Sequence, residues 1–442
     1  MSFPRYPKYK DSGVEWLGQV PEHWEAIRYK NVFEEKFVGA NGSLPLGSIS
    51  FGRVVFKSDV FFNEATKATY QQVQAGEFLI NPINLNYDLK SLRTALSEIN
   101  TCVSPAYIVL KAKGARDNNF LKHQLHAFDL FHMKTLGAGV RQTITFDDIG
   151  ACQTYLPPLP EQTRIAAFLD QETAKIDELV AEQQRLMALL KEKRQAVISH
   201  AVTKGLNPKA PMKPSGIEWL GQVPAHWETK PLKAVAKLFG RIGFRGYTTE
   251  DIVDEGEGAV TLSPSNMVEG KLALEKCTFI SWAKYNESPE IQIVANNVLI
   301  VKTGSTFGKT AFVDRVDQPM TINPQIAVFK NIICAPRFLF HVLNTPAIQS
   351  LIEISNKGST IPTMTQEAVG NFWIGLPPHG EQIEIVAFID AEQAQLNELT
   401  AEAQRAIDLL QERRTALISA AVTGQIDVRP GAPVSQPALR ER

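Results

Sequence analysis

The 442-residue sequence contains few cysteines, and their spacing excludes the common cysteine-based sites. The four residues, Cys102, Cys152, Cys277 and Cys334, form no CxxC pair and no Cys/His cluster with zinc spacing. We therefore expect reduced, mostly buried thiols in a cytosolic protein. No run approaches the ~18 apolar residues of a membrane span, and residues 1–10 have no apolar segment of the kind found in signal peptides.

The sequence also lacks an excess of positive charge. Lys and Arg number 46, Asp and Glu number 47, and the formal net charge is −1. Nucleic-acid-binding proteins are often strongly basic, so any basic surface here must be local and balanced by acidic residues elsewhere. Hydrophobic residues make up 44%, which is enough for two or three packed domains in a chain of this length.

Motifs of the common enzyme classes are missing as well. There is no HExxH or GxSxG pattern, no paired-carboxylate nuclease motif and no NPPF/DPPY-type methyltransferase motif. The nearest approach to a nucleotide site is VKTGSTFGKT at 301–310, where Gly304 and Gly308 enclose only three residues and a P-loop needs four. We expect no ATP site and no catalytic centre; an enzyme that binds nucleotide through Lys309 is kept as the third hypothesis.

An internal repeat is the main feature of the sequence. Residues 12–25, SGVEWLGQVPEHWE, return 203 positions later as SGIEWLGQVPAHWE, with twelve of fourteen positions identical. Residues 156–170, LPPLPEQTRIAAFLD, return 220 positions later as LPPHGEQIEIVAFID. The second intervening stretch is therefore longer by 17 residues. The stretches between the repeats share little except near their ends, where Thr143, Thr145 and Gly150 correspond to Thr363, Thr365 and Gly370.

The repeats divide the chain into two copies of one plan. We call the two variable stretches head 1 and head 2, and the aromatic segment before each head its opener. The predicted boundaries are an N-terminal opener (1–24), head 1 (25–155), a central helical region (156–205), a linker with the repeated opener (206–228), head 2 (229–375), a C-terminal helical region (376–426) and a flexible tail (427–442).

Each helical region has heptad patterning. One seam is expected at Leu169, Ile176, Gln183, Leu190 and Val197, with Leu179 and Leu186 as its companions. The second copy gives Ile389, Leu396, Ala403, Leu410 and Leu417, with Leu399 as companion. The first helix is predicted to start at Pro160, and Gly205 and Gly424 lie where helix C-caps are expected.

The fold class that follows is α+β. Two mixed α/β domains are separated by two long helices, which we expect to pack on each other as an antiparallel coiled coil with an internal pseudo-two-fold repeat. Within the heads, β-type runs lie at 78–80, 107–110, 297–301 and 325–329, and helical stretches at 120–131 and 337–344. The topology of the heads is left open.

The opener SGVEWLGQVPEHW, the LPPLPEQ-type helix start and the two divergent heads resemble the specificity subunits of Type I restriction-modification systems. The resemblance covers nearly the whole chain. It implies that each head is a target recognition domain for one half of a split, asymmetric site in double-stranded DNA. The helices would set the unread gap and dock two methyltransferase subunits. One departure is His379–Gly380 where the first copy has Leu159–Pro160.

The resemblance also places the chemistry on partner subunits. S-adenosylmethionine would belong to the methyltransferase, and ATP and Mg²⁺ to a restriction and translocase subunit, so this chain would carry no catalytic, metal or cofactor site. The implied location is the cytoplasm of a bacterium or archaeon, on the nucleoid. A coiled-coil scaffold that gathers proteins without recognising DNA is the alternative, motivated by the near-neutral charge.

Candidate DNA contacts in the heads are basic or polar residues near glycines. In head 2 they are Arg241, Arg245, Lys302, Ser305, Thr306, Lys309, Lys357, Ser359 and Thr360. In head 1 they are Arg53, Lys57, Lys90, Arg93, Arg141, Gln142 and Thr143. The competing interpretation is structural turns and solvated surface charges. Trp16, Trp24, Trp219 and Trp227 are instead expected to pack against the helices, because identical residues do not suit the recognition of different sequences.

Overall fold

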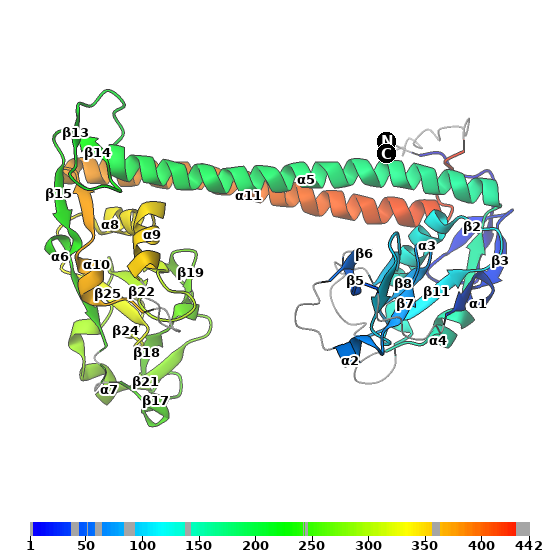
Figure 1. Cartoon of the computed structure of the whole chain (residues 1–442), viewed down its shortest axis with the longest axis horizontal. Helices are drawn as coiled ribbons and strands as arrows, with labels where there is room; N and C mark the ends of the chain where they lie inside the picture. The colour runs from blue at the N-terminus through cyan, green and yellow to red at the C-terminus, as the bar shows by residue number, and fades with distance from the viewer. Residues whose placement is uncertain are drawn as a thin grey trace, which may run out of the picture. The chain divides into compact units, whose positions relative to one another are not determined.

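The structure is a computed structural model, and it describes residues 3–36, 44–50, 52–57, 64–83, 93–137, 143–241, 243, 246–355 and 363–429. The chain forms two compact units: unit 1 comprises Met1–Gln183 and Gln404–Arg442, and unit 2 comprises Gln184–Ala403. Head 1 lies in unit 1 and head 2 in unit 2. Each unit also contains part of both long helices, α5 (Leu159–Lys204) and α11 (His379–Val422) (Figure 1).

Head 1 is built on a four-stranded antiparallel sheet with the order β4-β11-β8-β9. The strands are β4 (Phe33–Glu35), β11 (Ile108–Ala112), β8 (Phe78–Ile80) and β9 (Thr94–Leu96). The other elements of unit 1 are β1 (Tyr9–Asp11), β2 (Gln19–Pro21), β3 (Glu25–Arg28), α1 (Tyr29–Val32), β5 (Gly47–Ser50), β6 (Arg53–Phe56), α2 (Glu64–Lys67), β7 (Gln71–Val73), β10 (Thr101–Val103), α3 (Asn118–Phe131), η1 (Met133–Thr135), α4 (Phe146–Ala151) and β12 (Gln153–Leu156).

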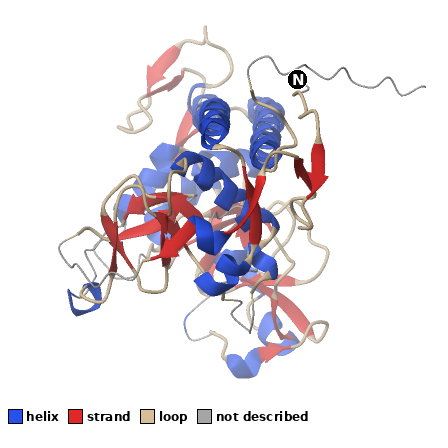
Figure 2. Ribbon diagram, turned by 90° about the vertical axis from the view of Figure 1, so that its right-hand side faces the viewer, coloured by secondary structure: helices blue, strands red, loops and turns tan. Residues whose placement is uncertain are grey.

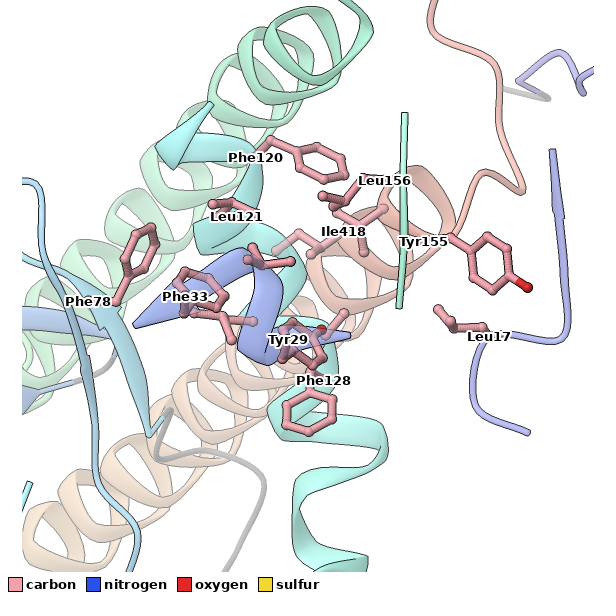
Figure 3. Packing of buried hydrophobic residues seen from close by; sticks show 14 of the residues in the cluster. Leu17, Tyr29, Phe33, Phe78, Phe120, Leu121, Phe128, Tyr155, Leu156 and Ile418 are labelled. Atoms are coloured by element: carbon pink, nitrogen blue, oxygen red, sulfur yellow. The ribbon is translucent and has the colours of Figure 1, made fainter. Parts of the chain in front are cut away.

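The core of unit 1 joins this sheet to helices from distant parts of the sequence. Phe33 and Phe78 of the sheet share one buried cluster with Phe120 of α3 and Ile418 of α11 (Figure 3). Helix α3 starts at Asp117, whose carboxylate accepts hydrogen bonds from the N–H groups of the first turn. Aromatic side chains bury large apolar areas, so this cluster fixes head 1 on the helix ends.

Head 2 repeats the sheet of head 1 with the order β16-β25-β22-β23. The strands are β16 (Lys237–Gly240), β25 (Ile326–Lys330), β22 (Val298–Val301) and β23 (Thr310–Phe312). The further elements are β13 (Met212–Pro214), β14 (Gln222–Pro224), β15 (Glu228–Pro231), α6 (Leu232–Val235), η3 (Thr249–Asp251), η4 (Pro264–Asn266), β19 (Met267–Val268), β20 (Lys271–Leu272), α7 (Trp282–Asn286), η5 (Pro289–Ile291), α8 (Pro336–Leu343), α9 (Pro346–Ser355), α10 (Gln366–Gly370) and β26 (Trp373–Leu376).

A second sheet distinguishes head 2. Its order is β17-β21-β18-β24, and β18 and β24 are parallel. The strands are β17 (Ile252–Val253), β21 (Thr278–Ser281), β18 (Gly258–Leu262) and β24 (Met320–Ile322). Leu299 and Val328 of the shared sheet pack against Val260 and Ile322 of the second one. The 17 extra residues thus belong to a head with an additional β-layer.

The long helices pack antiparallel within each unit, and Figure 2 shows them end-on, side by side. In unit 1, Arg414 of α11 donates to Asp177 of α5 at 2.7 Å. In unit 2, Arg194 of α5 donates to the side chain of Asn397 of α11. These two contacts are equivalent, because Arg194 and Asp177 correspond to Arg414 and Asn397 under the 220-residue offset. The predicted α+β fold with two mixed α/β heads, two long antiparallel helices and an internal repeat is confirmed.

The seams of the helices were only half predicted. Leu169, Ile176 and Leu190 of the first predicted seam are buried, and so are Ile389, Leu396, Ala403 and Leu417 of the second. The companion positions were wrong, because Leu179, Leu186 and Leu399 are 44%, 42% and 40% exposed. The buried companions lie one residue later in the heptad, at Thr173 and Ile407. Thr173 enters the seam because its hydroxyl donates to the backbone oxygen of Leu169 at 2.7 Å.

The described helices include none that is both long enough and apolar enough to cross a lipid bilayer. Helix α5 begins at Leu159 and α11 at the equivalent His379, so the His379–Gly380 departure leaves the start of the helix in place. Gly205 and Gly424 follow the helices with φ of +74° and +73°, which confirms them as left-handed C-caps.

Candidate nucleic-acid interface

The glutamate of each EQ motif holds the opener on the start of a long helix. Glu161 is buried and accepts hydrogen bonds from Tyr6 Oη at 2.7 Å and Trp24 Nε1 at 3.0 Å. In unit 2, Glu381 pairs in the same way with Trp227 Nε1 at 3.1 Å and His226 at 2.7 Å. Trp24 and Trp227 are fully buried, so their predicted packing against the helices is confirmed.

The glutamine of each EQ motif holds the head. Gln162 donates to the backbone oxygen of Pro157 at 2.9 Å and accepts from the N–H of Asp117, the cap of α3, at 3.1 Å. Gln382 repeats both contacts, with Pro377 at 2.8 Å and with Ala335, which precedes α8, at 2.6 Å. One amide thus fastens a head helix and a head strand to the long helix.

An aspartate on each long helix adds a charged contact with the head. Asp170 bonds His123 at 2.9 Å and Lys122 at 3.1 Å, and the hydrogen bond from His123 lowers the pKa of Asp170 to about 2. In unit 2 the equivalent Asp390 accepts from Arg337 Nε at 3.2 Å. Each head is therefore fixed to its helices by equivalent contacts, although the head residues differ.

The glycine-rich segment of head 2 is the hairpin between β22 and β23, at one end of the shared sheet. The N–H of Gly308 donates to Val301 O at 2.9 Å, and that of Val301 to Lys309 O at 2.8 Å. Gly304 and Gly308 have φ of +108° and +81°, which explains the two glycines. A strand follows this turn where a P-loop requires a helix. The geometry therefore agrees with the sequence in giving no support to a P-loop.

Four of the predicted residues of head 2 lie on this hairpin. Ser305 and Thr306 are exposed at its tip, while Lys302 and Lys309 are partly buried at its base. Lys309 Nζ donates to the backbone oxygen of Pro264 at 3.3 Å. The N–H of Met364 donates to Lys302 O at 2.9 Å, so the segment before α10 lies against the base of the hairpin.

Head 1 has the same arrangement. Its hairpin joins β8 to β9, and the N–H of Ile144 donates to Pro82 O at 3.1 Å, as Met364 does to Lys302. The exposed Thr143 and Thr363 are therefore equivalent, and Thr145 and Thr365 each cap the helix that follows. In each head, the base of this hairpin and the residue two positions before the short helix therefore lie side by side.

Residues 224–408 match the family model of the Type I restriction modification DNA specificity domain. Head 2 and the part of α11 that follows it therefore resemble a Type I DNA specificity domain. The chain is similar to the Type I restriction enzyme EcoBI specificity subunit of Escherichia coli, at 24% identity over 277 residues, which are 61% of this chain and 58% of that protein.

A solved structure shows the same fold. A chain from a structural study of complex assembly and conformational transition of the type I R-M system has a TM-score of 0.67 and 17% identity, over 91% of this chain and 98% of that one. The HsdS subunit from Thermoanaerobacter tengcongensis, also 17% identical, covers 92% of this chain and 98% of its own, with a TM-score of 0.48.

Two arginines that were predicted to contact DNA are buried within their heads. Arg93 is 5% exposed and its Nε lies 3.9 Å from Asp129, whose pKa burial raises to about 6. Arg241 is 3% exposed and donates to the backbone oxygen of Ile322 at 3.1 Å. Both side chains serve contacts inside the head in this structure, which favours the structural interpretation for them.

The remaining predicted residues fall into two groups. Arg53 and Lys57 are exposed on the β5–β6 hairpin, where Arg53 lies 3.6 Å from Asp177 of α5. Seven others lie outside the described residues: Lys90, Arg141, Gln142, Arg245, Lys357, Ser359 and Thr360. For the described and undescribed residues alike, contact with DNA stays a prediction.

Sequence reasoning missed two glutamines beside the head 2 hairpin. The backbone oxygen of Gln325 accepts from Lys302 N at 2.8 Å, and the side chain of Gln325 lies close to Gly304. The side chain of Gln366 lies against Gly240 of β16, at the same end of the sheet. Only the pairing of β16, β25 and β22 brings these residues together, so no local motif could have indicated them.

In head 2, exposed acidic residues lie on the additional β-layer, whereas two lysines lie at the hairpin of the shared sheet. Residues 249–257 of the additional layer carry Glu250, Asp251, Asp254, Glu255 and Glu257, of which all but Asp251 are exposed. These carboxylates would repel phosphates, whereas Lys302 and Lys309 lie at the hairpin. Within the part of the chain that the structure describes, no group of three or more His, Cys, Asp or Glu residues is placed to hold a metal ion.

Proposed function

We propose that this chain recognises DNA for a Type I restriction-modification complex, with each head binding one half of an asymmetric, gapped site. The observation that carries the proposal is the repeat of the framework contacts around hairpins of different sequence. Glu161 and Glu381, and likewise Gln162 and Gln382, hold their heads in the same way. Equivalent framework contacts that hold hairpins of different sequence suit a protein that recognises two different half-sites in the same way.

The long helices would set the gap between the half-sites. Helix α5 has 46 residues and α11 has 44, and each runs without a break in its secondary structure. A paired helix resists bending and compression better than a flexible linker does. Recognition helices of dimeric DNA-binding proteins meet half-sites about one helical turn, ~34 Å, apart. A helical spacer of defined length would select one gap in the same way.

The helices would also dock two methyltransferase subunits. Unit 1 exposes Leu179 of α5 and Leu409 of α11, at 44% and 64%, and unit 2 exposes the equivalent Leu399 and Leu189, at 40% and 52%. Exposed apolar side chains that recur at equivalent positions suit two copies of one partner protein. The partners would supply S-adenosylmethionine, and a restriction subunit would supply the site for ATP and Mg²⁺, so this chain contributes recognition without catalysis.

A genome-wide map of methyladenine, with and without this gene, tests the proposal. Deletion should abolish methylation at one asymmetric, gapped motif. Replacing residues 25–155 by a head from another family member should then change only one half of that motif. A change in both halves, or in neither, would contradict the proposal that each head binds one half of the site.

Binding measurements separate this proposal from the scaffold alternative. The assembled complex should bind a duplex carrying the mapped motif, and the affinity should fall steeply with salt because phosphate contacts release counterions. A scaffold that only gathers proteins would show no such binding. The near-neutral net charge is compatible with both, so the salt dependence is the deciding measurement.

A further inference from the structure

Lys302 lies at the base of the head 2 hairpin. It directly follows β22, whose four residues are all buried. Its N–H donates to Gln325 O at 2.8 Å, and its C=O accepts from Met364 N at 2.9 Å. Both backbone groups are therefore fixed by neighbouring segments, and the position of the side chain's base is fixed with them.

The side chain of Lys302 extends across the end of the sheet. Its Nζ would lie 3.2 Å from a β-carbon at Gly240, and its Cε 3.6 Å. Gly240 belongs to β16, and β25 separates β16 from β22. A larger residue at position 240 would crowd the ammonium group, so the glycine leaves room for the lysine.

This ammonium group has no partner inside the part of head 2 that the structure describes. Nothing there accepts a hydrogen bond from Nζ, and burial alone lowers the pKa of Lys302, without a compensating carboxylate. Lys309 on the same hairpin differs, because its Nζ bonds Pro264 O. A partly buried cation without an acceptor costs free energy in the fold, which is the pattern expected of a group that meets its acceptor on a ligand.

We infer that Lys302 is a specificity-determining residue of head 2, whose ammonium group binds the O6 and N7 acceptors of a guanine in its half-site. The inference rests on the proposed function. Lysine is well suited to these two acceptors in the major groove. A phosphate contact tolerates a mobile side chain, whereas base recognition requires a donor held in register. The fixed backbone and half-buried stem of Lys302 meet that requirement.

The test replaces Lys302 in the full chain, produced in the deletion strain with its natural partners. Lys302→Met keeps the aliphatic stem and removes the charge. The exchange of head 1 described above shows which half of the motif belongs to head 2. In that half, methyladenine maps of Lys302→Met should show several bases accepted at one position where the unaltered protein requires a G·C pair. The half-site of head 1 should stay unchanged. On purified complexes, discrimination at that base pair should fall about tenfold or more.

Lys330→Met is the matched control. Lys330 ends β25, is partly buried, and has its pKa lowered mainly by burial, so the two variants remove similar charges from one sheet. Lys330→Met should keep the complete motif. Thermal unfolding of both variants verifies that the heads remain folded.

Three results bear on the inference. Relaxation at one guanine supports it. Weaker binding to all sequences, with a salt slope reduced by about one, would identify a phosphate contact and overturn it. An unchanged motif in a folded Lys302→Met protein would overturn it as well. Failure of the proposed function itself gives a different result, because deletion of the gene would then leave the methylation map unchanged.

Discussion

The end of α11 offers a sharp test of how the framework holds the heads. Gly424 has φ of +73°, and a methyl group on it would lie 2.3 Å and 2.5 Å from Cδ and Cγ of Pro21. Trp24, the partner of Glu161, lies 3.2 Å away. The chain of unit 1 therefore reverses at Gly424 directly against the opener. We predict that Gly424→Ala loosens this junction far more than the equivalent change in unit 2.

The magnitude follows from two terms. The left-handed conformation costs a residue with a β-carbon about 1–2 kcal/mol. The contact with Pro21 adds about 1–3 kcal/mol of overpacking, because a proline ring has no rotamer that moves it away. Gly205 has nearly the same φ, but its closest neighbour is a carboxylate oxygen of Glu381 at 3.0 Å. Gly205→Ala should therefore cost little beyond the first term.

Hydrogen exchange measured by mass spectrometry resolves the two junctions separately, which a global unfolding curve of a two-unit chain does not. Each 1.4 kcal/mol of local stability corresponds to a tenfold change in protection. Peptides covering the end of α11 should lose roughly thirtyfold to four-thousandfold of their protection in Gly424→Ala, and those covering the end of α5 about tenfold in Gly205→Ala. Equal losses, or a greater loss in Gly205→Ala, would refute the role given to Pro21.

Three further predictions concern the framework and the heads. Glu161→Gln should destabilise unit 1 by about 1–3 kcal/mol, because buried donors of Tyr6 and Trp24 lose a charged acceptor; hydrogen exchange measures it, with Glu381→Gln as the matched change in unit 2. Burial, helped by Arg337, lowers the pKa of His341 to about 4, so the folded head binds its proton less readily than the unfolded chain, whose histidine pKa is about 6.5. The stability of unit 2 should be complete above pH 6.5 and fall by up to about 3 kcal/mol as the pH drops to 4; a flat profile between these values, or one that His341→Phe does not flatten, would contradict this. Insertion of residues near Gln183, or near Ala403, should change the gap of the methylated motif or abolish assembly. An unchanged gap in an active complex would contradict the proposal that the long helices set the gap.

The framework could be predicted from the sequence because its signals are local. The strand at 78–80, the helix start near Pro160 and the glycine caps each depend on a few adjacent residues. The companion seam could not be predicted, since apolar Leu179 fits the heptad better than Thr173 on hydrophobicity alone. Thr173 is buried because its hydroxyl is satisfied by its own helix, a contact that hydropathy does not count.

The candidate DNA contacts were harder to predict because basic residues have two uses. Arg93 and Arg241 lie in sequence contexts that suit DNA contact, yet both side chains are buried in contacts within their heads. Lys302 and Lys309 are close in sequence and equal in charge, and only the structure separates them, through the bond of Lys309 to Pro264. Which cations are already engaged is a tertiary property, and composition cannot supply it.

The division between framework and hairpin also explains how the heads can differ without loss of the fold. The contacts that fix a head are made by the EQ motif and by backbone groups, such as the N–H of Asp117 and Ala335, whose hydrogen bonds do not depend on side-chain identity. The hairpin strands are held by the buried sheet, and Ser305 and Thr306 at the tip of the head 2 hairpin are exposed, where substitutions cost little. Residues at the hairpin can therefore change while the contacts that fix the head are preserved. A second β-layer can even be added to one head, as in head 2, because it packs on the sheet and leaves the contacts of Gln382 in place.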